Sequence, residues 1–128
     1  MLLHLSDLSP EPLHQQVSRQ IREKVFSGDL MMGEALPSIR ALARDHHISV
    51  ITVQRAYDDL SREGLLVARQ GKGVFVASLD EKGKQMMAID RLREALIPIL
   101  REAKISGLNE NDIRQLVEDV FRKEEVES

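Results

Sequence analysis

The 128-residue sequence contains no cysteine, so it offers neither a disulfide framework nor a cysteine-based zinc or iron–sulfur site. No apolar run approaches the ~20 residues that a membrane span needs. The first ten residues lack the basic and apolar regions of a signal peptide. We therefore expect a cytoplasmic protein with no contact to a membrane.

The sequence also lacks the motifs of common enzymes. It has no Gly-x-Ser-x-Gly nucleophile elbow and no paired carboxylates in a glycine-rich loop. Gly71-Lys72-Gly73 is similar to a phosphate-binding fragment, but no helix pattern directly follows it, as such a site requires. His46 and His47 are adjacent, so on a helix they point about 100° apart and cannot bind one ion together. We expect no catalytic residue, no metal and no cofactor.

The charge of the chain is unevenly distributed. Hydrophobic residues make up 42% and charged residues 30%, which is typical of a folded globular protein. The net charge of −3 is unusual for a nucleic-acid binder. From Ser38 to Val76, however, basic residues outnumber acidic ones, whereas residues 79–128 contain nine basic and twelve acidic residues. This distribution favours a front half that faces DNA.

The spacing of apolar residues predicts three helices in the front half. The first covers about residues 12–27, and the second covers about 39–46 after the N-cap candidate Ser38. The third begins after Ser49 and ends at Gly64. Its predicted buried stripe consists of Val53, Ala56, Tyr57 and Leu60.

A β-hairpin is predicted after the third helix. Two aliphatic runs, Leu65–Arg69 and Val74–Ala77, are joined by the turn residues 70–73. A very short extended piece is expected around Ala35 and Leu36. This order of elements is that of a winged helix-turn-helix. The fold class is therefore mainly α with a small β-hairpin (α+β).

The remaining residues predict a two-helix tail. A long amphipathic helix covers about Met86–Ala103, and Pro98 should force a kink in it. A final helix follows the cap candidate Asn109. Two amphipathic helices cannot close a core, so we expect them to pack against a second copy of the chain. The predicted organisation is a winged helix-turn-helix DNA-binding domain over 1–78 and a two-helix dimerisation region over 79–128.

An ordered series of motifs in the front half resembles the GntR family of regulators. The motifs are Leu36-Pro37-Ser38-Ile39-Arg40-Ala41-Leu42-Ala43, Thr52-Val53-Gln54-Arg55-Ala56-Tyr57, Glu63-Gly64-Leu65-Leu66 and Gly71-Lys72-Gly73-Val74-Phe75-Val76. The resemblance covers about Pro10 to Val76. The short tail is similar to that of the YtrA subfamily, in which two helices serve dimerisation. The resemblance implies an operator-binding repressor, often one that governs a transport operon.

Three segments provide the predicted DNA contacts. Arg40, in the first turn of the second helix, can reach a phosphate or a guanine edge with a forked pair of donors; the alternative is an ion pair with Asp45 or another acid. The third helix would enter the major groove by its N-terminal end, and the glycine-rich turn would lie against the DNA backbone. The predicted contacts are Ser38, Arg40, Ser49, Val50, Ile51, Thr52, Gln54, Arg55, Gln70, Gly71, Lys72 and Gly73.

The sequence departs from the family pattern in two places. His14 stands where tyrosine is usual, and Val50-Ile51 stand where many members have polar or basic residues. Both aliphatic residues should be exposed, on the side opposite the buried stripe, where a thymine methyl could contact them. One hypothesis is therefore a homodimeric repressor on a near-palindromic DNA operator, with a possible unknown small-molecule effector at the dimer interface. The alternative is a winged-helix module that binds protein through Val50 and Ile51.

Overall fold

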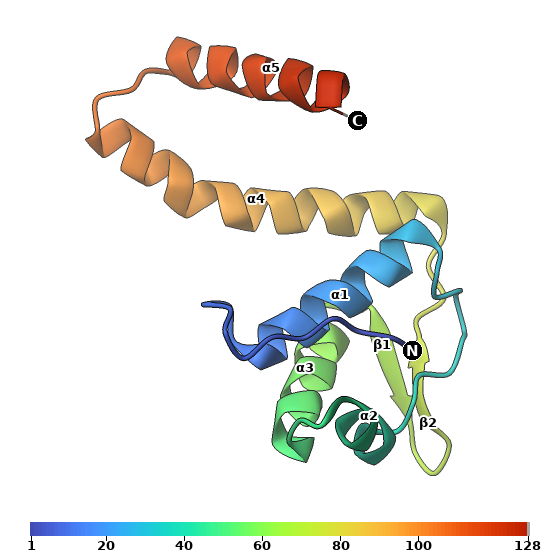
Figure 1. The fold of residues 1–128 in the computed structure, drawn as a ribbon. Coiled ribbons are helices and arrows are strands. Elements are labelled where there is room, and N and C mark those ends of the chain that lie inside the picture. The colour runs from blue at the N-terminus through green and yellow to red at the C-terminus, as the bar shows by residue number, and fades with distance from the viewer. Residues whose placement is uncertain (128) are drawn as a thin grey trace. The chain divides into compact units, whose positions relative to one another are not determined.

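Helices form most of the structure, together with one small sheet (Figure 1). The computed structural model describes residues 1–127, in two compact units, Met1–Glu81 and the chain from Lys82 onward. The described elements confirm the predicted α+β fold class. In chain order they are α1 (Leu13–Ser27), α2 (Ile39–His46), α3 (Val50–Arg62), β1 (Leu66–Arg69), β2 (Gly73–Val76), α4 (Glu81–Ile105) and α5 (Glu110–Glu127).

Two serines begin the helices of the helix-turn-helix. Ser38 Oγ accepts a hydrogen bond from the backbone N–H of Ala41 at 3.1 Å, and Ser49 Oγ accepts one from Thr52 at 3.0 Å. Each bond satisfies an N–H group that the start of a helix leaves without an intrahelical partner. Both predicted caps are confirmed.

The turn between α2 and α3 depends on a residue with positive φ. His47 has a left-handed backbone conformation, with φ 54°, and its N–H points at the carbonyls of Ala43 and Arg44. The next N–H, of Ile48, donates to the Ala43 carbonyl at 3.0 Å. These bonds end α2 within one residue, so that Ser49 can begin α3 at once.

The core of the first unit lies between α1 and α3. The predicted stripe of α3 is confirmed, since the buried side chains of this helix are Val53, Ala56, Tyr57 and Leu60. Tyr57 donates its hydroxyl to the Pro37 carbonyl at 2.8 Å, so the polar atom of this large side chain has a partner. Burial raises the pKa of the Tyr57 phenol.

The hairpin is joined to the segment that precedes α2. Ala35 forms a bridge with Phe75, and the Leu36 N–H donates to the Val74 carbonyl at 2.9 Å. These contacts confirm the predicted short extended piece and hold the hairpin next to the start of α2. Within the hairpin, the antiparallel register pairs Leu66 with Val76, Val67 with Phe75, Ala68 with Val74 and Arg69 with Gly73.

The second unit has no buried side chain among its described residues. Pro98 lies inside α4, and the axis of α4 changes direction in the part nearer α5 (Figure 1). A proline removes one intrahelical hydrogen bond and crowds the preceding turn, which is the physical basis of the predicted kink. The large apolar residues exposed on the two helices are Met86, Ile89, Leu92, Leu96, Ile97, Ile99, Ile105, Leu116, Val117, Val120 and Phe121.

The start of α5 has the predicted cap. Asn109 Oδ1 accepts a hydrogen bond from the Asp112 N–H at 2.8 Å, and the Asp112 carboxylate accepts one from the Asn109 N–H at 3.0 Å. This reciprocal pair satisfies two donors at the helix start. Over residues 1–127, no helix is long and apolar enough to cross a membrane.

Candidate nucleic-acid interface

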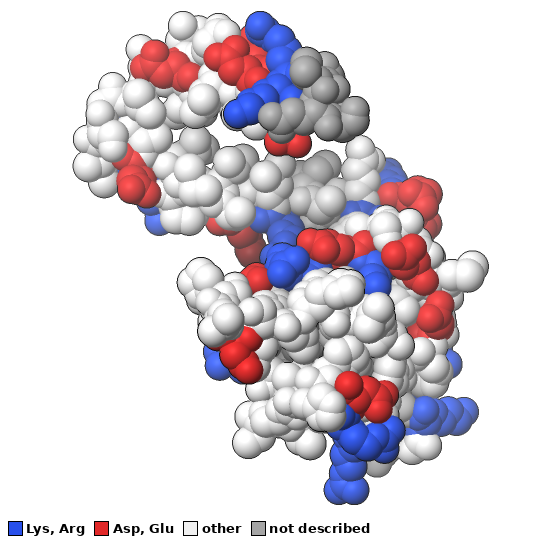
Figure 2. Space-filling model, viewed as in Figure 1, with Lys and Arg blue, Asp and Glu red and all other residues white. Residues whose placement is uncertain are grey.

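Helix α2, the start of α3 and the β1–β2 turn lie at the same end of the first unit (Figure 1). Of the twelve predicted contact residues, all are exposed except Thr52, which is half-buried. Figure 2 shows lysine and arginine side chains gathered at this end of the unit. The fold therefore brings three separate stretches of sequence to one exposed surface with several cations, as a DNA-binding module requires.

The first turn of α3 combines a polar cap with two exposed aliphatic residues. Ser49 and Thr52 share a hydrogen bond between their hydroxyls at 2.8 Å, in addition to the cap itself. Val50 is 48% exposed and Ile51 is 79% exposed. The prediction that both are exposed is confirmed, although only Ile51 lies opposite the buried stripe, whereas Val50 lies at the edge of that stripe, three residues before Val53.

Further along α3, the two long polar side chains differ in their surroundings. Gln54 donates its amide to Asp58 Oδ1 at 2.8 Å, one turn later in the same helix. Arg55 is exposed and forms no ion pair among the described residues. Asp58 therefore engages one of the two N–H groups of the Gln54 amide, whereas the Arg55 guanidinium has no acidic partner within the described residues.

Arg40 lies in the first turn of α2 and is also exposed. The alternative expectation, an ion pair with Asp45, does not hold, because Asp45 contacts Arg44 Nε at 3.3 Å. Arg40 forms no ion pair with any side chain that the structure describes. Its guanidinium is therefore free to approach an external anion.

The hairpin turn forms a narrow projection with a lysine near its tip. The Lys72 N–H donates to the Arg69 carbonyl at 2.9 Å, and Gly71 lies at the third position of this turn with φ 74°. Glycine adopts this conformation without a Cβ penalty. The Arg69 guanidinium lies 5.2 Å from the centre of the Phe75 ring, where it stacks on the aromatic face. Lys72 is exposed and forms no ion pair within the described chain.

Several other arginines of the first unit are engaged within the protein. Arg19 contacts Glu11 at 2.9 Å, and their hydrogen bonds lower the pKa of the Glu11 carboxyl and raise the pKa of Arg19. Arg22 forms two hydrogen bonds with the Glu63 carboxylate, at 2.9 and 2.8 Å. These pairs lie outside the three segments of the candidate interface. Arg19 and Arg22 thus form ion pairs within the protein, whereas Arg40, Arg55 and Lys72 of the interface have no acidic partner among the described residues.

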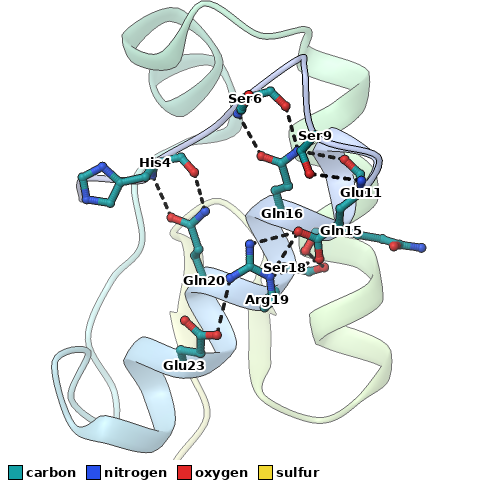
Figure 3. Close-up of polar contacts among 10 residues, drawn as sticks. All are labelled: His4, Ser6, Ser9, Glu11, Gln15, Gln16, Ser18, Arg19, Gln20 and Glu23. Atoms are coloured by element: carbon teal, nitrogen blue, oxygen red, sulfur yellow. Dashed lines mark hydrogen bonds and ion pairs between the residues drawn. The ribbon is translucent and has the colours of Figure 1, made fainter. Parts of the chain in front are cut away.

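Two glutamines of α1 have a role that the sequence patterns did not predict (Figure 3). Gln16 accepts a hydrogen bond from the Ser6 N–H and donates to the Ser6 carbonyl, both at 2.9 Å. Gln20 pairs with both backbone groups of His4 in the same way, at 2.8 and 2.7 Å. These four hydrogen bonds hold the N-terminal segment around residues 4–6 against α1. Apolar periodicity could not reveal this, because a buried glutamine such as Gln16 looks like a surface residue in the sequence.

His46 connects the same N-terminal segment to α2. Its Nε2 atom lies 3.1 Å from the Leu3 N–H, and its Nδ1 atom lies 3.2 Å from the Leu42 carbonyl. Both ring nitrogens therefore contact the backbone of the protein. Among the described residues, no group of three or more histidine, aspartate or glutamate side chains is placed to hold a metal ion.

Comparison with known proteins places this arrangement among bacterial regulators. The family described as "Bacterial regulatory proteins, gntR family" matches residues 13–76. The transcriptional regulator YhcF of Bacillus subtilis, of uncharacterised function, is 30% identical over 82% of this chain and 86% of its own. The transcriptional repressor YtrA of B. subtilis is 24% identical over 93% of this chain and 92% of its own.

Two solved structures extend the comparison. YtrA from Sulfolobus acidocaldarius, described as a GntR-family transcription factor, is 27% identical, with a TM-score of 0.57 over 94% of this chain and 97% of its own. The DNA-binding domain of AraR in complex with operator ORX1 is 31% identical, with a TM-score of 0.53 over 59% of this chain and 93% of its own. The first of these similarities includes the tail, and the second is a relative bound to DNA.

Proposed function

This chain belongs to the GntR family of bacterial regulatory proteins, in its YtrA subfamily, and we propose that it represses transcription as a homodimer. It is a DNA-binding regulator and not an enzyme. The proposed operator is a near palindrome whose half-sites lie about one helical turn, ~34 Å, apart. A dimer with twofold symmetry presents two identical recognition helices and therefore matches two identical half-sites.

The observation that supports DNA recognition most directly is the set of free cations at one end of the first unit. Arg40, Arg55 and Lys72 are exposed and form no ion pair among the described residues, although many acids are present in the chain. Unpaired cations that come from three separate elements suit a polyanion, because each one can neutralise a phosphate and release a counterion.

We assign different parts of the DNA to the different segments. The wing residues Gln70 to Gly73 would lie on the sugar–phosphate backbone, where the glycines permit close approach and Lys72 supplies charge. The hydroxyls of Ser38, Ser49 and Thr52 suit phosphate contacts at the helix starts. The residues proposed to reach base edges in the major groove are Arg40, Val50, Ile51, Gln54 and Arg55.

We further propose that residues 1–78 form the DNA-binding domain and residues 79–128 the dimerisation region. The support is the lack of any buried side chain among the described residues of the tail, combined with its regular apolar stripes. A second copy of the chain offers the same stripes and could cover them. Binding of a small-molecule effector would then release the operator by changing the dimer geometry.

Repression and the identity of the target genes rest on similarity. The B. subtilis relative YtrA is named a repressor, and the subfamily resemblance favours an operon that encodes a transporter. We place the protein in the cytoplasm, where its operator would be found.

The salt dependence of binding tests the proposal. The DNA upstream of the protein's own operon would be searched for an inverted repeat, and this duplex titrated with the full chain at several salt concentrations. If Arg40 and Arg55 contact phosphate together with Lys72, six cations in the dimer should make affinity fall about 10³-fold between 50 and 200 mM salt, and if the two arginines read bases the fall should be about 10-fold. If the chain instead bound a protein through Val50 and Ile51, DNA affinity would be weak and the apolar contact would change little with salt.

A further inference from the structure

The polar groups at the start of α3 are largely engaged with one another. The Ser49 hydroxyl caps the helix through the Thr52 N–H, and it also shares a hydrogen bond with the Thr52 hydroxyl at 2.8 Å. Whichever oxygen donates in that bond, one hydroxyl proton remains for a phosphate. The Ser49 oxygen is therefore occupied by both the cap and the Thr52 hydroxyl, which suits this pair to a phosphate at the helix start.

The amide that follows is engaged as well. Reading an adenine through Gln54 requires both its amide oxygen and its amide nitrogen. The nitrogen already donates to Asp58 Oδ1 at 2.8 Å. A second N–H group of this nitrogen stays free, so base recognition by Gln54 has one donor available while the bond to the Asp58 carboxylate restricts how the amide can turn.

Two aliphatic side chains remain at the leading end of the helix. Val50 and Ile51 occupy its first two positions and are 48% and 79% exposed, whereas Val53 and Leu60 of the same helix are fully buried. The fold thus buries the other aliphatic residues of α3 but leaves Ile51 largely exposed and Val50 about half exposed. In a major groove, the apolar group available to such a pair is the C5 methyl of thymine.

We propose that Val50 and Ile51 determine operator specificity by packing on thymine methyl groups, with Ile51 as the principal contact because it is the more exposed. This inference rests on the proposed function, since it names what the recognition helix reads. Specificity at these base pairs then comes from a methyl group and not from a hydrogen bond. The Arg40 and Arg55 guanidiniums remain available for guanine or phosphate.

The test begins with selection of an operator from a random duplex library by the full-length chain. Each thymine of the selected duplex is then replaced by uracil, which removes only the methyl group and keeps every hydrogen-bonding atom. We expect a two- to fourfold loss of affinity at one or two thymines of a half-site, since burial of one carbon changes an equilibrium about fourfold. When the same thymine is replaced by uracil in both half-sites, the total loss of affinity should be the product of the two single losses.

Substitutions at Val50 and Ile51 test whether these two residues cause the loss of affinity on uracil replacement. The uracil penalty should vanish in the double variant Val50→Ala, Ile51→Ala and should persist in Leu8→Ala, which shortens an aliphatic side chain that is 96% exposed elsewhere. Ile51→Val removes a single carbon and should reduce the penalty without abolishing it. Because all these positions are exposed, thermal unfolding should match that of the wild type.

The outcomes separate the two proposals. A selected operator whose uracil penalties are absent, or are unchanged in the double variant, overturns thymine reading and leaves the repressor proposal intact. A selection that enriches no sequence, together with DNA binding that does not depend on salt, overturns both and favours a protein partner for this pair.

Discussion

Both units of this chain contain amphipathic helices, but the apolar stripes of these helices are buried in the first unit and exposed in the second. All the buried apolar side chains of the described residues lie in Met1–Glu81, where α1, α3 and the hairpin cover one another. In the second unit, α4 and α5 repeat apolar residues at helical spacing, yet those residues are exposed. Leu60 and Leu92 illustrate the contrast, since the first is fully buried and the second is 59% exposed.

The comparison teaches that amphipathic spacing shows only that one face of a helix is to be covered. It does not show what covers the face. In the first unit the covering elements belong to the same chain, since α1 packs against α3 and α3 against the hairpin. In the second unit only two helices are available, and a second copy of the chain is the simplest partner.

The largest expected effect comes from removing the second unit. A chain cut after Ser78 keeps the whole described core, so it should fold and remain monomeric. Its operator affinity should fall about 10²- to 10⁴-fold, because each half-site is then bound without the benefit of a linked partner. Sedimentation velocity and an operator titration measure the two properties. A truncated chain that still sediments as a dimer would show that the tail is not the dimerisation region.

The next prediction compares matched substitutions in the two units. Leu60→Ala should lower the free energy of unfolding by about 2–5 kcal/mol, because it leaves a cavity in a packed core. Leu92→Ala should not change the unfolding of the dilute monomeric chain but should weaken the dimer. Urea denaturation at two protein concentrations distinguishes these effects. Equal destabilisation of the dilute chain by both variants would mean that the tail has an intramolecular core.

A smaller effect is expected at the polar edge of the core. Tyr57→Phe removes the hydroxyl that donates to the Pro37 carbonyl at 2.8 Å. The free energy of unfolding should fall by about 1–2 kcal/mol, because a partly buried carbonyl loses its partner. Thermal and urea denaturation at neutral pH measure the change. If stability were unaffected, water must replace the hydroxyl at this carbonyl.

The same residue predicts a pH dependence. Burial raises the pKa of Tyr57, so the folded chain holds the phenol proton more tightly than the unfolded chain does. This contribution to stability is complete below about pH 10, the ordinary pKa of tyrosine, and is lost as the pH rises above it. Between pH 10 and 11 the wild type should therefore lose more stability than Tyr57→Phe. Parallel slopes would contradict the prediction.

The smallest expected effect concerns DNA affinity when one lysine is removed from the first unit or from the second. Lys72→Ala should weaken binding to all DNA sequences by a similar small factor and reduce the salt slope by about 1 per contact, and therefore by about 2 in a dimer that loses one phosphate contact in each protomer. Lys123→Ala removes an exposed lysine of α5 and should leave the slope unchanged. Titrations of operator and random duplexes provide the measurement. A Lys72 variant that loses only operator binding would show that the wing reads bases.

Local features of the fold could be predicted because their causes lie within a few residues. Ser38, Ser49 and Asn109 are followed by helical patterns, and each is the cap that its side chain predicts. The buried stripe of α3 follows from its spacing for the same reason. The exposure of Ile51 could also be deduced, because a residue opposite the buried stripe of a helix must face away from the core.

Features that depend on distant partners could not be predicted. Gln16 and Gln20 bind backbone groups 10 and 16 residues away, and no local pattern distinguishes them from surface glutamines. The left-handed turn at His47 has no glycine to indicate it. The pairing of Asp45 with Arg44, and not with Arg40, depends on how the side chains of α2 are oriented.

The sequence by itself determined the caps that begin α2, α3 and α5, the apolar side of the helices and the family that the motifs resemble. Those properties follow from side-chain chemistry and helical periodicity over one or two turns. Only the tertiary structure decided that α2, the start of α3 and the β1–β2 turn lie at the same end of one unit, and that Arg22 pairs with Glu63, 41 residues away. It also left Arg40, Arg55 and Lys72 without an acidic partner among the described residues. The physical reason is that charge and hydrogen-bond partners are chosen by distance in space, which the chain sets only after α1, α3 and the hairpin have packed.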